Sequence, residues 1–224
     1  MGMLPLNLEM AGRQVLIVGG GRVAQRKAQQ LLMADATLVI VSPQLTDRLE
    51  ELVSAGLVEV WRRTFQPSDL EGFFMAIAAT NDRLVNQLVA TAARGAGVMV
   101  SVADDPSRSD LHFPAVLRRG DLLIALSTGG RVPALAAWIR NDLEKRYGPA
   151  YAEVVATLAL TREKLLTAGK GEFYNKELFL TLLDRGLPEM VARGDNAAVE
   201  KLLAEVQSEC EAKDHPDAED EYQW

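Results

Sequence analysis

Cysteine, histidine and long apolar runs are scarce in this chain of 224 residues. Cys210 is the only cysteine, which excludes a disulfide within the chain and any metal site built from several cysteines. His112 and His215 are the only histidines, so one chain cannot form a metal site with many histidine ligands. The longest wholly apolar stretch, residues 73–79, is far too short to span a bilayer. Since the N-terminus also lacks the pattern of an export signal, we expect a cytoplasmic protein with no membrane contact.

Positive charge is not in excess either. The chain has 24 lysines and arginines against 31 acidic residues, a net charge of −7. Residues 209–224 hold seven acidic residues and one lysine, so the remainder is close to neutral. No basic stripe is present, which argues against a nucleic-acid partner. We expect residues 209–224 to be an acidic, disordered tail that aids solubility, with a regulatory role as the alternative.

A glycine turn is the most informative motif that the chain does contain. Residues 19–24 follow the apolar run at 15–18 and fit the spacing G-x-G-x-x-A. A strand, a glycine turn and a helix in this order hold the pyrophosphate of a dinucleotide, because glycine lets the backbone approach and the helix start offers unpaired N–H groups. We predict a dinucleotide bound at Gly19, Gly20 and Gly21. The alternative is an ordinary glycine-rich turn between a strand and a helix.

The end of the second expected strand bears on the choice of cofactor. NAD-binding folds commonly place an acidic residue there to bind the ribose hydroxyls, but here the strand is followed by Ser42-Pro43-Gln44. We expect Ser42 or Gln44 to hydrogen-bond the ribose instead. The nearest acidic residue, Asp47, begins the next helix. No arginine follows the strand to bind a 2′-phosphate, so NAD is favoured over NADP.

The first half of the chain alternates between buried strands and amphipathic helices. This order gives parallel strands joined by crossover helices, which predicts an α/β fold with a Rossmann-like doubly wound parallel sheet. The expected strands are residues 15–18, 37–41, 58–61, 73–79 and 98–103.

The pattern changes after Asp104 to a loop, one further strand at 122–126 and a helix opened by Pro133. From Tyr151 onward it is all-helical, with interruptions at residues 169–171 and 186–188 and a last helix capped by Asp195. We expect four parts: an NAD-binding domain at 1–113, a small segment at 114–148, a helical domain at 149–208 and the tail at 209–224.

Polar residues follow the fourth and fifth strands, and ligands of such sheets lie outside the carboxyl ends of the strands. Thr80 and Asn81 would therefore face the cofactor. Asp82 is better explained as the N-cap of the following helix. Asp104 would lie in the same crevice, where a carboxylate can accept a proton as hydride leaves to a nicotinamide. The alternative for Asp104 is a turn-forming role shared with Asp105.

Ser127-Thr128-Gly129-Gly130 is a second glycine turn before a helix. Its backbone N–H groups would bind an anion, or the turn is an ordinary tight junction.

Eight segments taken together identify a family. They are residues 4–6, 15–27, 76–82, 85–86, 102–106, 113–115, 124–130 and 133–136. In this order they resemble the precorrin-2 dehydrogenase and sirohydrochlorin ferrochelatase family, which occurs as a stand-alone protein and as the N-terminal module of bacterial sirohaem synthase. The resemblance covers the first two of the four expected parts well. In the remainder the helical character matches, but the motifs match less.

The resemblance implies an enzyme that oxidises precorrin-2 to sirohydrochlorin with NAD, and in several relatives also inserts ferrous iron to give sirohaem. It implies a homodimer in which the segment after the sheet, residues 114–148, serves dimerisation. The family's essential aspartate falls on Asp104, which would act as the base. The implied cofactor contacts are Gly21, Arg22, Val23, Pro43, Gln44 and Thr80.

The tetrapyrrole would lie near the Ser127–Gly130 turn, and we add His112, Phe113 and Pro114 to the expected substrate contacts. No metal ligand is certain, with Asp104 and His112 as the candidates for Fe²⁺. A relative's serine at the position of Thr128 is phosphorylated, and threonine leaves that undecided here.

Three positions depart from the family pattern. Asp35 stands where glycine is usual, Asn81 replaces a common aspartate and Ser101 replaces a common asparagine. Two competing functions remain open at this stage. One is an NAD-sensing module without catalysis, and the other is a chelatase with a degenerate nucleotide site.

Overall fold

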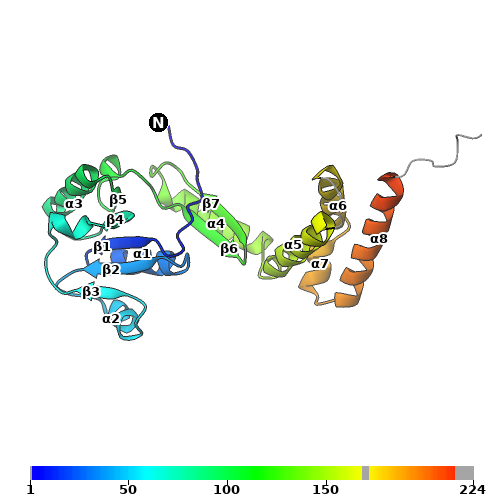
Figure 1. Ribbon diagram of the computed structural model, residues 1–224, viewed down its shortest axis with the longest axis horizontal. Helices are drawn as coiled ribbons and strands as arrows, with labels where there is room; N and C mark the ends of the chain where they lie inside the picture. The colour runs from blue at the N-terminus through cyan, green and yellow to red at the C-terminus, as the bar shows by residue number, and fades with distance from the viewer. Residues whose placement is uncertain (1, 168–171, 215–224) are drawn as a thin grey trace, which may run out of the picture. The chain divides into compact units, whose positions relative to one another are not determined.

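The computed structural model describes residues 2–167 and 172–214 (Figure 1). The chain divides after Phe113 into two compact units, residues 1–113 and residues 114–224. Within the described ranges, no helix is both long enough and apolar enough to cross a membrane.

A five-stranded parallel sheet forms the centre of the first unit. Its strands are β1 (Gln14–Val18), β2 (Thr37–Val41), β3 (Glu59–Trp61), β4 (Met75–Ala78) and β5 (Met99–Val102). They are ordered β3-β2-β1-β4-β5, and every neighbouring pair is parallel. The predicted Rossmann-like doubly wound sheet is confirmed. Val18 pairs with Val41 and Ala78, so the carboxyl ends of β1, β2 and β4 are level.

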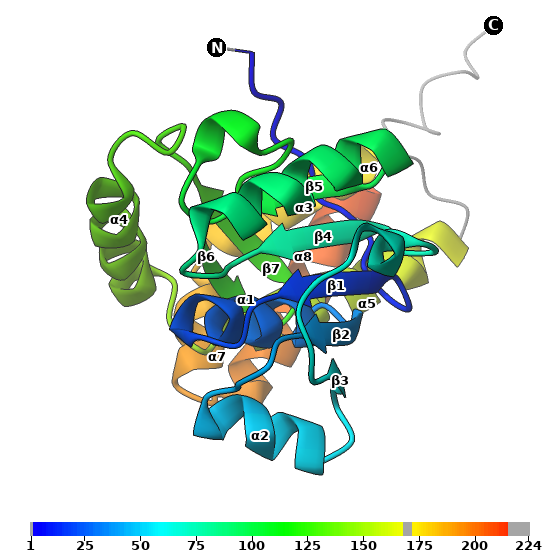
Figure 2. The same ribbon diagram turned by 90° about the vertical axis from the view of Figure 1, so that its left-hand side faces the viewer.

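Helices cover both faces of this sheet (Figure 2). One core cluster joins α1 (Arg22–Leu32) and α2 (Asp47–Ser54) to one face, and a second joins α3 (Arg83–Ala96) and the short 3₁₀ helix η1 (Pro67–Leu70) to the other. The strands read as nearly continuous apolar runs because both of their faces are buried. Each fully buried isoleucine or leucine contributes about 1.5–3 kcal/mol of transfer free energy.

Asp35 occupies a left-handed backbone conformation between α1 and β2. Its φ is +57°, and it is the one non-glycine residue with positive φ among the described residues. Its carbonyl accepts a hydrogen bond of 3.0 Å from the Gly12 N–H, which joins this turn to the turn before β1. The family's usual glycine at this position is therefore explained by backbone geometry. Aspartate is tolerated because its short polar side chain visits this region more readily than most.

The second unit begins with an antiparallel hairpin of β6 (Ala115–Arg119) and β7 (Leu122–Leu126). The strand at β7 was predicted, but β6 was missed, because no element was assigned between the loop after Asp104 and residue 122. The two residues between the strands, Gly120 and Asp121, form a tight hairpin turn, and Gly120 has a φ of +55°. A glycine-aspartate pair between two short apolar runs is a recognised hairpin signal. The helix α4 (Pro133–Arg146) packs on both strands and confirms the helix expected after Pro133.

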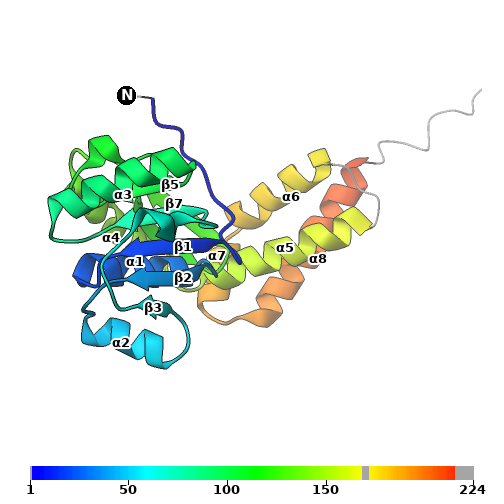
Figure 3. The ribbon, with the colours of Figure 1, turned by 60° about the vertical axis from the view of Figure 1, so that its left-hand side comes forward.

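Four helices follow, α5 (Tyr151–Thr167), α6 (Glu172–Asp184), α7 (Leu187–Ala192) and α8 (Asn196–Asp214) (Figure 3). Their shared core contains Val154, Leu165, Leu178, Leu182, Leu187, Val191, Leu202 and Val206. The region is all-helical as expected. The break at residues 186–188 is real, since Gly186 has a φ of +87°, but it also starts the short α7, which the sequence reading missed. The break expected at residues 169–171 lies outside the described residues.

The last helix extends into the segment that we expected to be an acidic tail. Asp195 caps α8 as predicted, accepting a hydrogen bond of 3.1 Å from the Ala198 N–H. The helix continues to Asp214, so residues 209–214 are helical rather than part of a disordered tail. A paired contact from Arg185 to the Glu209 carboxylate, 2.9 Å at its Oε1, ties this last part of α8 to the end of α6. The rest of the expected tail, residues 215–224, lies outside the described residues, and the four-part division stays a prediction.

Replacing Asp35 by glycine should stabilise the protein, because glycine adopts positive φ without the clash that an L side chain meets there. We expect Asp35→Gly to raise the free energy of unfolding by about 0.5–1 kcal/mol, measured by urea titration. Asp35→Ala is the matched control and should lower it, because alanine lacks both the freedom of glycine and the polar side chain of aspartate. A gain in stability from alanine would contradict the backbone explanation.

Candidate functional site

The turn after β1 fits against its neighbours through backbone atoms. A Cβ added to Gly19 would lie 2.4 Å from the Ala79 carbonyl oxygen, and one added to Gly20 would lie 2.0 Å from the Gln44 carbonyl oxygen. Both glycines are therefore required by the loops after β4 and β2. Gly21 differs, since a Cβ there would meet no atom within 4 Å. The fold leaves open space at the Cβ position of Gly21, as the close approach of a ligand to the backbone would require.

The start of α1 is suited to an anion. Gly21 is its N-cap and supplies no side-chain hydrogen bond, and the first turn contains no acidic residue. The N–H groups of a first turn have no partners within the helix, and the helix dipole adds partial positive charge. Arg22 and Val23 are exposed at this end. The residues present therefore fit a dinucleotide pyrophosphate.

The loop after β2 closes one side of the glycine turn. Ser42 is buried, and its hydroxyl donates a 2.7 Å hydrogen bond to the Gln44 carbonyl. The Thr46 N–H donates a 3.0 Å bond to the Gly20 carbonyl. In this structure the Ser42 hydroxyl shapes the loop, whereas Pro43 and Gln44 are exposed. A ribose contact from Ser42 or Gln44 stays a prediction.

At the end of β4, Thr80 is bonded to a buried amide on the next helix. The Asn86 Oδ1 accepts bonds from the Thr80 N–H (3.1 Å) and from the Thr80 hydroxyl (2.8 Å). Asn81 is exposed beside it. Asp82 is the N-cap of α3, accepting from the Leu84 N–H at 2.8 Å, which confirms the capping interpretation.

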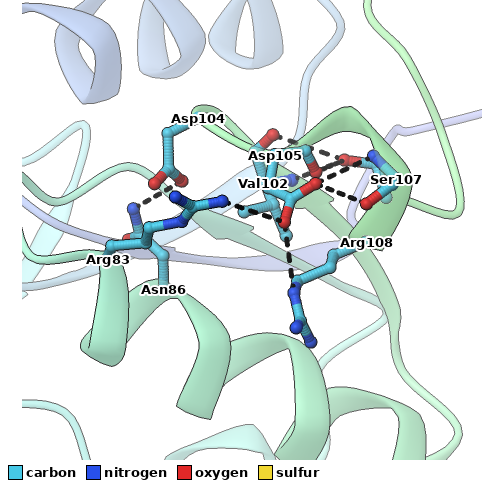
Figure 4. A network of polar contacts seen from close by, with 8 residues as sticks. Arg83, Asn86, Val102, Asp104, Asp105, Ser107 and Arg108 are labelled. Carbon is cyan, nitrogen blue, oxygen red and sulfur yellow. Dashed lines mark hydrogen bonds and ion pairs between the residues drawn. The ribbon is translucent and has the colours of Figure 1, made fainter.

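The two adjacent aspartates after β5 have different surroundings (Figure 4). The Asp105 carboxylate accepts from the Ser107 N–H and hydroxyl and from Arg108, so it holds the turn into η2 (Pro106–Arg108). The hydrogen bond from the Ser107 hydroxyl, together with the nearby guanidinium groups of Arg108 and Arg83, lowers the pKa of the Asp105 carboxyl.

Asp104 takes no part in that turn. It is exposed, and its Oδ1 accepts a 2.8 Å hydrogen bond from the Asn86 Nδ2. Figure 4 shows the Asn86 side chain rising from α3 toward this carboxylate. The turn-forming alternative thus describes Asp105, while Asp104 presents an exposed carboxylate at the sheet edge where ligands of such folds bind.

The expected substrate residues lie in both units. Phe113 is half-buried against the α1 face of the first unit, with the Lys27 ammonium 3.7 Å from its ring centroid. Burial, with the charge of Arg26 adding to it, lowers the pKa of Lys27 to about 8. His112 and Pro114 are half-buried on either side of Phe113.

The Ser127–Gly130 turn belongs to the second unit. The Gly129 N–H donates to the Ser127 hydroxyl and the Val132 N–H donates to the Thr128 hydroxyl, both at 3.1 Å. Gly129 and Gly130 have φ values of +64° and +75°. The hydroxyls hydrogen-bond within the turn that precedes α4, and anion binding by this turn stays a prediction.

Two further results concern metal binding and the residue that sequence reasoning missed. Among the residues whose side chains are described, no group of three or more His, Cys, Asp and Glu side chains is placed to hold a metal ion. Asn86 lies in one of the segments that carry the family resemblance, but sequence reasoning assigned it no role in the site. Its signal was a polar side chain one turn after the N-cap Asp82, where α3 faces the strand ends.

Comparisons with known proteins bear on the family. Residues 6–115 match a family described as putative NAD(P)-binding, and residues 119–146 match one described as sirohaem biosynthesis protein central. Siroheme synthase 1 of Aeromonas salmonicida is 39% identical over 204 residues, which cover 89% of this chain and 43% of that protein. Siroheme synthase of Stutzerimonas stutzeri is 39% identical over 203 residues, covering 90% and 43%.

A solved structure, SirC, a precorrin-2 dehydrogenase, matches with a TM-score of 0.73 and 26% identity over 92% of this chain and 100% of that one. The chain belongs to the precorrin-2 dehydrogenase and siroheme synthase family. It spans less than half the length of the siroheme synthases that it matches.

Substitution of Gly20 and of Gly21 in the nucleotide turn should affect different properties, the first stability and the second NAD binding. Gly20→Ala should destabilise the fold, because its Cβ would overlap the Gln44 carbonyl. Gly21→Val should fold with a melting temperature near that of the unmodified protein but lose NAD binding, because the side chain fills the space that the pyrophosphate needs. Thermal unfolding and calorimetric titration with NAD measure the two effects. Normal NAD affinity in Gly21→Val would contradict the assigned cradle.

Proposed function

We propose that this chain oxidises precorrin-2 to sirohydrochlorin with NAD, in the synthesis of sirohaem. The observation that carries the proposal is the pairing of two features that follow β1 and β5, two strands of the same parallel sheet with β4 between them. One is the uncapped helix start at Gly21, with open space at its Cβ position. The other is the exposed Asp104 carboxylate, oriented by a buried amide. A nucleotide cradle and a base are the two parts that a dehydrogenase requires.

The oxidation removes two hydrogens from the macrocycle, one as hydride and one as a proton. NAD, when bound, is the hydride acceptor. Asp104 accepts the proton, a role that suits a carboxylate held in place by one oxygen and open to the crevice. The N–H groups at the start of α1 bind the pyrophosphate, and the loops after β2 and β4 flank the rest of the dinucleotide. In this proposal the half-buried Phe113 of the first unit contacts the tetrapyrrole.

Insertion of ferrous iron into sirohydrochlorin is the second activity that the family resemblance supports, with Fe²⁺ as a substrate. Asp104 would then remove the pyrrole protons that the metal replaces. An NAD-sensing module would need the cradle but not the ordered Asp104 side chain, and a chelatase alone would need no open Gly21. The dehydrogenase uses both features.

The protein works as a homodimer in this proposal, with α4 in the interface. Val132, Leu135 and Trp138 are exposed by 49%, 46% and 68%, and their spacing places them along one side of this helix. A strip of large apolar side chains in solvent is typical of an interaction surface. A tetrapyrrole with many carboxylates is large enough to be held between two copies of the chain.

The base assignment makes Asp104→Ala the decisive variant. With enzymatically generated precorrin-2 and NAD and without metal, NADH absorbance and the sirohydrochlorin spectrum should both rise for the unmodified protein. Asp104→Ala should fold and bind NAD but turn over about 10²–10⁴-fold more slowly, the usual contribution of general base catalysis.

Asp82→Asn is the control, because it removes a nearby carboxylate and keeps the helix cap. Undiminished turnover in Asp104→Ala would exclude Asp104 as the base. NAD binding without any turnover by the unmodified protein would favour the sensing module.

A charge in the α4 strip should separate the two copies. We expect Trp138→Glu to convert the dimer into a monomer in sedimentation velocity, because a carboxylate is costly to bury between apolar side chains. Leu160→Glu on α5 is the control, since Leu160 is also exposed, by 60%, but lies outside the strip. If Trp138→Glu keeps the mass of the unmodified protein, α4 is not in the interface.

A further inference from the structure

Asn86 is the most completely bonded polar side chain at the candidate site. It lies in the first turns of α3 and is only 1% exposed. Its Nδ2 donates to the Thr80 carbonyl at 3.1 Å and to the Asp104 Oδ1 at 2.8 Å. Its Oδ1 accepts from the N–H and the hydroxyl of Thr80. Two donors and two acceptor positions are the full capacity of an amide, and here each has a partner.

These partners fix which way the amide points. A backbone N–H can only donate, so the Asn86 atom that faces the Thr80 N–H must be the oxygen. A carbonyl can only accept, so the atom that faces the Thr80 carbonyl must be the nitrogen. With both ends set by the backbone of Thr80, the second hydrogen of Nδ2 is directed at Asp104. The backbone at the end of β4 therefore holds the donor that contacts this carboxylate.

We propose that Asn86 is a positioning residue, which sets the Asp104 carboxylate in a fixed relation to the end of β4. This inference rests on the proposed function, in which Asp104 is the base and the loop after β4 flanks the dinucleotide. One carboxylate oxygen is occupied by the amide, so the side chain presents its other oxygen to the substrate. Because the Asn86 amide is bonded to both Thr80 and Asp104, it fixes the distance between the base and the loop that flanks the dinucleotide.

The bond to Asp104 is not explained by stability alone. Three hydrogen bonds with Thr80 satisfy the Asn86 Oδ1 and one of the two Nδ2 hydrogens. Asp104 is exposed, and water would satisfy its carboxylate if the amide were absent. Holding an exposed side chain in one rotamer costs conformational entropy. The fold gains a partner for the second hydrogen of the buried Nδ2, and a base that must meet a particular hydrogen of the substrate gains accuracy.

A double-mutant cycle separates positioning from structure. The four proteins are the unmodified chain, Asn86→Ala, Asp104→Ala and the double variant, assayed with precorrin-2 and NAD. We expect Asn86→Ala to lower kcat about 10–100-fold, the scale of a misplaced catalytic group, with KM for both substrates changed less than about threefold. In the Asp104→Ala background the same substitution should cost nothing further, because the group it positions is gone.

Two more variants protect the test from a folding defect. Asn86→Leu keeps the approximate size of the side chain but has neither a donor nor an acceptor, so its kcat should fall at least as far as that of Asn86→Ala. Gln87→Ala truncates the neighbouring amide on α3 and should leave kcat unchanged. NAD affinity and thermal unfolding confirm the folded state of each protein.

The outcomes distinguish this inference from the proposed function. Equal losses from Asn86→Ala with and without Asp104 would overturn it, because Asn86 would then act independently of the base. Full kcat in Asn86→Leu would overturn it as well, since no donor would remain. Full activity in Asp104→Ala would instead refute the role of Asp104 itself, on which the inference rests.

Discussion

Backbone contact between the turn after β1 and the loops on either side of it is the constraint on which the site depends. β1 is the central strand, and its turn touches the carbonyl of Gln44 on one side and that of Ala79 on the other at distances that only glycine permits. This packing fixes the start of α1 relative to the ends of β2 and β4. The N–H groups of α1, the loop at Ser42 and the amide bonded to Thr80 all take their places from it.

Most of the first unit was predictable because its signals are local. Apolar runs bounded by glycine and by helix caps predicted all five strands and their helices, and their alternation predicted parallel strands joined by crossovers. The order of the strands in the sheet was not predicted. The roles within the site were less accessible. Whether Asp104 or Asp105 forms the turn depends on which side chain meets Ser107, and no spacing encodes that. Asn86 was missed because its importance arises from two partners that are distant in sequence, Thr80 and Asp104.

In the second unit the failures have a common origin. The strand β6 and the helix α7 are short, so neither produces a long hydrophobic pattern. β6 begins just after the loop before Ala115, and α7 begins inside the glycine-leucine-proline run at 186–188, which was interpreted only as a break. The late end of α8 has another cause, because an acidic composition suggests a tail, whereas the helix continues past the Arg185–Glu209 contact to Asp214.

The contacts that hold the glycine turn are made to carbonyl oxygens and not to side chains. Carbonyl groups are present whatever residue occupies a position, so the loops after β2 and β4 are able to change sequence without disturbing the cradle between them. Pro43, Gln44 and Asn81 point away from the packed interior and are exposed. Substitutions at these positions can therefore change which dinucleotide is preferred. The backbone geometry that binds the phosphates would stay the same.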